Sequence, residues 1–153
     1  MKRDHSPSPR VATSHVAPPI RPPAIIPFNT YVYEHVNNID LKADVYLPSS
    51  PSTGPLPVAL YIPGGGWIGV DRDDYSRPLL FVLLSQGFVD CCMDCRLVPE
   101  TSFAELKEDV KCIETWIIQD LSVKIVFPGV KVDCTKLVVV GASAGGQLAL
   151  LAV

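Results

Sequence analysis

The feature that most constrains the fold is a serine placed between two glycines directly after an apolar run. Residues 137–140 have the β-branched, apolar composition of a buried strand, and Gly141, Ser143 and Gly145 follow at alternate positions. A sharp turn from a strand into a helix strains the backbone at its tip and brings neighbouring segments close together, so small residues are needed on either side. The sequence therefore predicts a strand, a tight turn with Ser143 at its tip, and a short helix beginning at Ala144.

Segments of strand length alternate with segments of helical pattern along the rest of the chain. Strands are expected at residues 30–36, 41–47, 58–62, 88–95 and 136–140. The first two are joined by a short Asn-containing turn and should form an antiparallel hairpin. The alternation predicts an α/β fold with a mostly parallel sheet, an antiparallel opening hairpin and helices on both faces.

Two helices are expected between the later strands. One starts near Ser76 and ends before Gly87, and the other starts at Ser102 and carries an apolar stripe as far as Ile117. Ser102 and Glu105 have the spacing of a capping box. Residues 120–135 are expected to be irregular, with a turn at residues 128–129.

The first 28 residues differ in composition from the rest of the chain. Seven prolines in this stretch remove backbone donors and favour extended conformations. We expect residues 1–28 to be a flexible leader, with a Pro-rich ligand for a partner as the alternative, and residues 29–153 to be one domain.

Charge and cysteine content exclude several classes of function. Thirteen basic and sixteen acidic residues, without a basic cluster, give no support for nucleic-acid binding. No apolar stretch is long enough for a membrane span or a signal peptide, so we expect a cytoplasmic protein.

The five cysteines are expected to be reduced. Cys92 and Cys95 match a C-x-x-C pattern, but their apolar surroundings favour core positions over redox or metal binding.

A serine at such a turn is suited to nucleophilic attack on a carbonyl carbon. The amide of the following residue, Ala144, lies at a helix N-terminus and can donate to the oxyanion that forms. Further donors are expected from a loop after the third strand, where Gly64, Gly65 and Gly66 provide amides without side chains. A phosphate-binding role of the glycines is disfavoured, because the Lys-Ser/Thr pair of a P-loop is missing.

Four ordered segments resemble the α/β-hydrolase fold, in particular its hormone-sensitive-lipase-like esterase branch. They are residues 61–67 (YIPGGGW), 94–100 (DCRLVPE), 103–109 and 141–146 (GASAGG), which are similar to the family's HGGGW, DYRLAPE, following helix and GDSAGG segments. The resemblance covers about residues 30–153. It implies hydrolysis of a small-molecule carboxylic ester, as in a carboxylesterase or lipase, without metal or organic cofactor. Ser143 would be the nucleophile, and the amides of Gly65, Gly66 and Ala144 would form the oxyanion hole.

The chain departs from this family pattern in two ways. Pro63 stands where the family has the histidine that holds the glycine loop by hydrogen bonds. In addition, the catalytic acid and histidine follow the serine in the family, and neither occurs after Ser143. The three histidines are His5, His15 and His35, and we expect His35 to be an ordinary strand residue.

These departures lead to the expectation of an incomplete fold that lacks its C-terminal half. Such a chain should be inactive or poorly soluble, and the edge of its fifth strand, at residues 137–140, should be open to pairing with a partner. The alternative function is a non-catalytic binding or interaction protein with the same fold. The acidic residues Asp71, Asp73 and Asp74 either line the mouth of a pocket or belong to a solvated loop.

Overall fold

The computed structural model describes residues 26–49, 53–69, 71–125 and 129–152. Its strands are β1 (Phe28–Val36), β2 (Ile39–Tyr46), β3 (Leu56–Ile62), β4 (Val89–Met93) and β5 (Val132–Gly141). Its helices are α1 (Arg77–Ser85), α2 (Phe103–Trp116), α3 (Ser122–Lys124) and α4 (Ala144–Leu151), with a 3-10 turn η1 (Gly65–Trp67) and a π-helical turn η2 (Ile117–Leu121). Residues 1–25, which make up most of the expected leader, lie outside the described residues.

The strands form one mixed sheet in the order β1-β2-β4-β3-β5. The opening hairpin β1-β2 is antiparallel and joins β4 antiparallel, whereas β3 pairs in parallel with both β4 and β5. The predicted fold class is confirmed. Because β3, β4 and β5 run in the same direction, the segments that leave their carboxyl ends meet at one end of the sheet.

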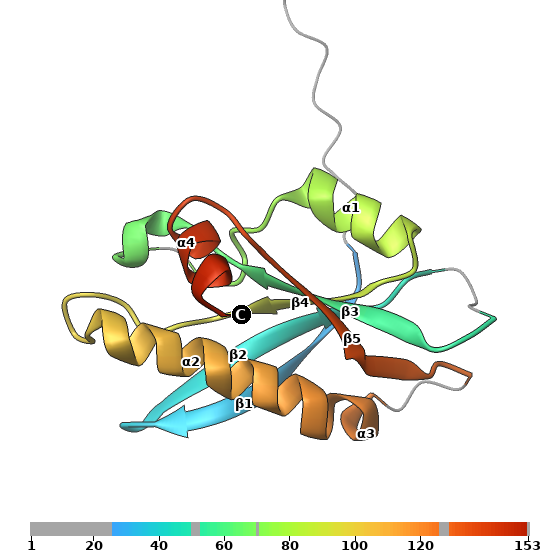
Figure 1. The fold of residues 1–153 in the computed structure, drawn as a ribbon, viewed down its shortest axis with the longest axis horizontal. Coiled ribbons are helices and arrows are strands. Elements are labelled where there is room, and N and C mark those ends of the chain that lie inside the picture. Colours follow the sequence, from blue (N-terminus) through green and yellow to red (C-terminus); the bar gives the residue numbers. More distant parts are fainter. Residues whose placement is uncertain (1–25, 50–52, 70, 126–128, 153) are drawn as a thin grey trace, which may run out of the picture.

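Helices cover both faces of the sheet. Helix α1 lies on one side, and α2, α3 and α4 lie on the other (Figure 1). The larger core joins the sheet to α2 and α4 through buried residues such as Leu106, Ile113 and Leu148, while the smaller core under α1 includes Tyr46 and Leu80. Each fully buried side chain of this size contributes roughly 1.5–3 kcal/mol of stability by leaving water.

Helix α2 begins where the sequence indicates and ends at Trp116, one residue before the expected end, but helical turns follow it directly. The Ser102 side chain accepts from the backbone of Glu105, and the Glu105 carboxylate accepts from the backbone of Ser102, which completes the predicted capping box. The expectation that residues 120–135 are irregular is wrong. After Trp116 the chain forms η2 and α3, because buried Ile117 and Leu121 extend the apolar stripe, and β5 already starts at Val132.

The β5 strand forms one edge of the sheet. It pairs with β3, and no second partner strand occurs within the part of the chain that the structure describes. Val138, in its middle, is 40% exposed. The expected pairing of this edge with a partner remains a prediction. No described helix has the length and apolarity that crossing a bilayer would require.

Candidate active site

Ser143 occupies the tip of a tight turn between β5 and α4. It is exposed, and its backbone angles, φ 50° and ψ −116°, lie in a region that residues with a side chain rarely adopt. A residue in such a conformation costs of order 1–3 kcal/mol, and the surrounding structure must hold it there. The predicted strand, turn and helix around Ser143 are therefore present.

The glycines on either side of Ser143 are required by close backbone contacts. A Cβ atom at Gly141 would collide with the carbonyl group of Gly145, and a Cβ atom at Gly145 would collide with the carbonyl oxygens of Ile62 and Pro63. Since these neighbours are backbone atoms, they could not move aside without distorting β3 or α4. The two glycines thus allow α4 to fold back against the end of β3.

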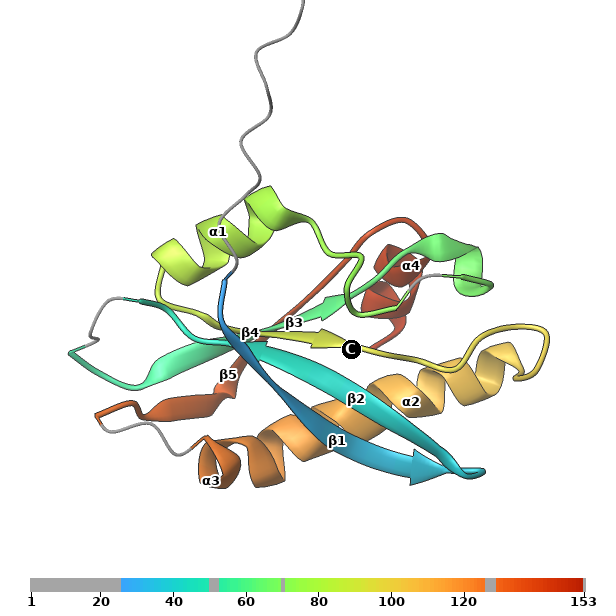
Figure 2. The same cartoon turned by 180° about the vertical axis from the view of Figure 1, so that it is seen from behind.

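The glycine loop that follows β3 lies beside this turn. The Ala142 amide donates to the Ile62 carbonyl at 3.2 Å, and a Cβ atom built on Gly64 would lie 3.5 Å from the Cβ of Ser143. Both views of the ribbon place η1 next to α4 (Figures 1 and 2). The structure therefore brings together the two glycine-rich segments that sequence analysis assigns to one site.

Three backbone amides are the candidate oxyanion donors. Among the described residues, the amides of Gly65, Gly66 and Ala144 donate to no backbone carbonyl outside their own elements. Gly65 and Gly66 have φ angles of 74° and 64°, which favour glycine. Ala144 is the first residue of α4, so the positive end of the helix dipole adds to its amide.

Trp67 is a neighbour of this site to which sequence analysis gives no separate role. Its indole nitrogen donates to the Ala144 carbonyl at 3.3 Å, across 77 positions of sequence. The YIPGGGW motif places an aromatic residue directly after the glycines, but its partner on α4 depends on the folded structure.

The segment after β4 is held by two arginines. Arg96 bonds to the buried Asp109 carboxylate through its backbone amide and its guanidinium, at distances from 2.7 to 3.2 Å, and to the Glu105 carbonyl at 3.0 Å. Arg72 contacts Asp44 at 3.0 Å and Asp94 at 2.7 Å. Because hydrogen bonds to ionised partners are the stronger ones, these pairs fix the segment that packs against the glycine loop.

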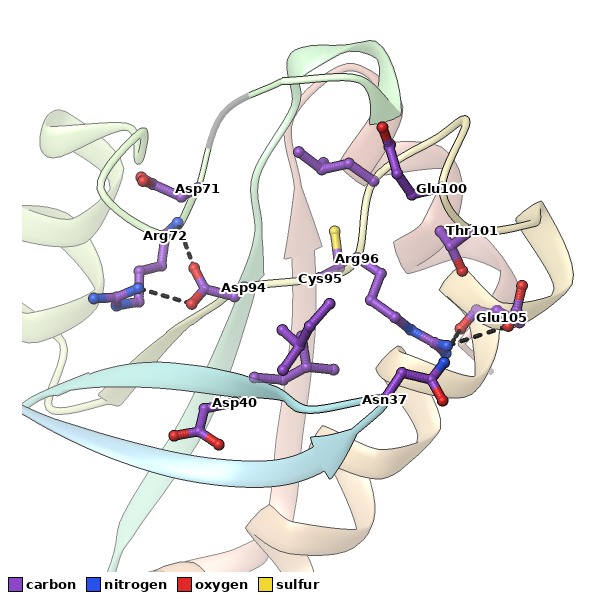
Figure 3. A pocket seen from close by; sticks show the side chains of 13 residues that line it. Asn37, Asp40, Asp71, Arg72, Asp94, Cys95, Arg96, Glu100, Thr101 and Glu105 are labelled. Atoms are coloured by element: carbon purple, nitrogen blue, oxygen red, sulfur yellow. Dashed lines mark hydrogen bonds and ion pairs between the residues drawn. The ribbon is translucent and has the colours of Figure 1, made fainter.

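These two arginines also border a cavity of about 490 Å³. Its walls come from the β1-β2 turn, residues 71–72, residues 94–97 and the start of α2 (Figure 3). Of the three acidic residues expected at a pocket mouth or in a solvated loop, Asp71 is part of the lining, whereas Asp73 and Asp74 are not. Ser143 is not part of it either. The cavity therefore lies beside the candidate site and is separate from the nucleophile.

The titratable groups near the site have pKa values set by local bonding and burial. Bonds from the backbone and hydroxyl of Ser102 lower the pKa of Glu105 to about 2. Burial is the main cause that raises the pKa of the Cys95 thiol to about 11, so this thiol is protonated at neutral pH. All five cysteines are free thiols, and Cys92 is fully buried, which agrees with core positions for the C-x-x-C pair.

His35, on β1, is not a neighbour of Ser143. His35 lies on the edge strand opposite to β5, and its ring bonds to Asp40 at 2.7 Å with a side chain 75% exposed. His5 and His15 lie outside the described residues. The expectation that His35 is an ordinary strand residue fits its position.

Comparisons with known proteins link this geometry to esterases. The BD-FAE family matches residues 43–153. The butyrate-bound structure of the esterase Est2 from Thermogutta terrifontis superimposes with a TM-score of 0.67 at 29% identity, covering 80% of this chain and 42% of that one. The same esterase phosphonylated by sarin matches with a TM-score of 0.68 at 28% identity, over 85% of this chain and 46% of that one.

A fungal biosynthetic enzyme is similar in sequence. The non-reducing polyketide synthase ascC of Acremonium egyptiacum is 37% identical over 123 residues, which is 80% of this chain and 6% of the synthase. The chain thus spans less than half of the esterase and a small part of the synthase. Its sheet and helices match about half of an esterase α/β-hydrolase fold.

Proposed function

The chain belongs to the BD-FAE family, and we propose that it carries the nucleophile and oxyanion hole of a serine hydrolase that acts on carboxylic esters. The observation that carries the proposal is the strained, exposed Ser143 at the tip of a strand-turn-helix, directly beside a loop of three glycines. We expect this combination to present a hydroxyl to a carbonyl carbon and to offer amides to the negative charge that develops on the oxygen. The matched esterases support the same chemistry.

In the proposed reaction, the Ser143 Oγ attacks the carbonyl carbon of the ester. The carbonyl π bond opens, and the oxygen takes up negative charge that the amides of Gly65, Gly66 and Ala144 stabilise. Collapse of this intermediate re-forms the carbonyl and breaks the bond to the alkoxy oxygen, which takes up a proton and leaves as the alcohol. Water then hydrolyses the acyl group from Ser143 as the carboxylic acid. The serine proton must pass to a base, and none of the described histidines lies beside Ser143.

This arrangement predicts slow acylation that an added base accelerates. Amides that stabilise the oxyanion retain part of the rate enhancement when the base is lacking, because residual catalysis survives the loss of triad residues. Imidazole in solution can take the place of the base. We choose a butyryl ester as the substrate, because the Thermogutta terrifontis esterase was obtained with butyrate bound.

The test is the release of p-nitrophenolate from p-nitrophenyl butyrate by the full chain, with and without imidazole. The proposal predicts release that imidazole accelerates beyond its own reaction with the ester, and an acyl group on Ser143 detected by mass spectrometry. The S143A variant should show only the background reaction. Equal release by the folded wild-type chain and S143A in imidazole would refute the proposal.

A further inference from the structure

The two halves of the proposed oxyanion hole belong to segments that are far apart in the sequence. One half is the glycine loop after β3, and the other is the first residue of α4, after β5. The backbone contacts between these segments involve Ile62, Gly64 and Gly145. Beyond Gly64 the loop continues through two glycines, which have the greatest backbone freedom of all residues.

Trp67 is the first side chain after these glycines, and it reaches α4. Its Nε1–H donates to the carbonyl of Ala144 at 3.3 Å, so it contacts the residue whose amide is the candidate donor. The bond therefore ties the end of the loop to the N-terminus of α4. A shift of the loop away from α4 would break it.

The indole of Trp67 also contacts a second aromatic side chain. Its ring packs edge-to-face on Phe103, with centroids 5.5 Å apart and an interplanar angle of 76°. The Trp67 carbonyl accepts from the Val98 amide at 2.8 Å. The residue also has a φ angle of 65°, which costs energy and persists only because these contacts hold it.

Pro63 makes the hydrogen bond from Trp67 to Ala144 more important for the glycine loop. The resembling family holds its glycine loop through a histidine at this position, and proline has neither a polar side chain nor an amide hydrogen. Trp67 supplies a side-chain hydrogen bond from the other end of the same loop.

We propose that Trp67 is a positioning residue that holds the Gly65 and Gly66 amides at the correct separation from the Ala144 amide. Its indole N–H sets the position of the loop relative to α4, and its ring on Phe103 sets the orientation of the indole. The inference rests on the proposed function, because the amides need a common target only if Ser143 forms an oxyanion.

Trp67→Phe tests the proposal, because phenylalanine keeps an aromatic ring for Phe103 and removes the N–H donor. Trp116→Phe is the matched control, since the Trp116 indole nitrogen is buried and has no hydrogen-bond partner among the described residues. The first readout needs no activity: hydrogen exchange at the Val98 amide, which the Trp67 carbonyl protects. We expect exchange there to be about tenfold faster in W67F and unchanged in W116F, with the Leu60 amide in β3 as the internal reference.

The second readout is the rate of Ser143 acylation in imidazole. We expect W67F to lower this rate by about tenfold or more at every pH without changing the shape of the pH profile, because oxyanion donors lose effect when misplaced. Unchanged exchange at Val98 would overturn the proposal, as would faster exchange with an unchanged acylation rate. If the wild-type chain is not acylated, the proposed function fails, and with it the role of Trp67 in positioning the amides.

Discussion

Relief of the backbone strain at Ser143 should make the protein more stable. The φ of 50° and ψ of −116° at this residue correspond to a cost of order 1–3 kcal/mol for a residue with a side chain. Glycine adopts such angles without the clash of a Cβ atom, but it loses about 0.5–1 kcal/mol more conformational entropy on folding. We therefore expect Ser143→Gly to raise the free energy of unfolding by roughly 0.5–2 kcal/mol.

Ser143→Ala is the matched control for this prediction. Alanine keeps the Cβ atom and hence the strain, and it removes the same hydroxyl, which makes no capping hydrogen bond to α4. The free energies of unfolding would be measured by urea denaturation, with equal m-values as evidence that the denatured state is unchanged. We expect S143G to unfold at a higher urea concentration than both S143A and the wild-type chain. Equal midpoints for S143G and S143A would refute the claim that the turn stores strain at the serine.

Three further predictions concern the surroundings of the site. Burial raises the pKa of Asp90 from 3.8 to about 7, so stability should fall as the pH rises from about 4 to 7, and Asp90→Asn should remove this dependence. The difference between the folded and unfolded pKa of Asp90 corresponds to a loss of at most about 4 kcal/mol in the free energy of unfolding. Urea denaturation midpoints across that pH range would measure this loss. Gly145→Ala should destabilise the chain by more than about 3 kcal/mol, because its Cβ would collide with the Ile62 carbonyl, and a midpoint within error of the wild type would contradict this. Arg96→Lys should lower the thermal midpoint, because lysine cannot reproduce the forked bonds to Asp109, whereas Lys111→Arg, in an exposed pair, should leave it unchanged.

The parts of the fold that follow from short-range signals could be predicted from the sequence. The capping box at Ser102 requires two residues three positions apart, and the turn at Ser143 requires glycines two positions to either side. Both signals are local, so both predictions place the element correctly. The opening hairpin and the central strands also have the expected order, with ends that differ by one or two residues.

The helical segment expected from the sequence ends too early, and the expected fifth strand starts too late. The stripe of buried residues continues from Ile117 to Leu121 and Ile125, at steps of four, and this periodicity could have indicated the longer helical segment. The start of β5 is harder to predict, because Asp133 and Thr135 are polar and Thr135 is exposed. Its first residues join the sheet because Val132 pairs with Leu56 on β3, a contact distant in sequence.

The contacts that arrange the candidate site also join residues that are distant in sequence. The bond from Trp67 to Ala144 joins two segments that approach each other only after β3 and β5 pair. The pairing of Arg72 with Asp44 likewise joins the loop after η1 to β2. The spacing of the motifs indicates which segments meet at the site. Which atoms donate and accept the hydrogen bonds between them depends on the fold.

Covalent capture of Ser143 tests whether this residue is a nucleophile beside a formed oxyanion hole. The full chain and S143A would be treated with a fluorophosphonate probe, with and without imidazole, and the site of attachment found by peptide mass spectrometry. Thermogutta terrifontis esterase 2 has been obtained phosphonylated by sarin. We expect a single adduct on Ser143 that forms faster with imidazole and is absent from S143A. A folded wild-type chain that acquires no adduct on Ser143, even with imidazole, would contradict this expectation.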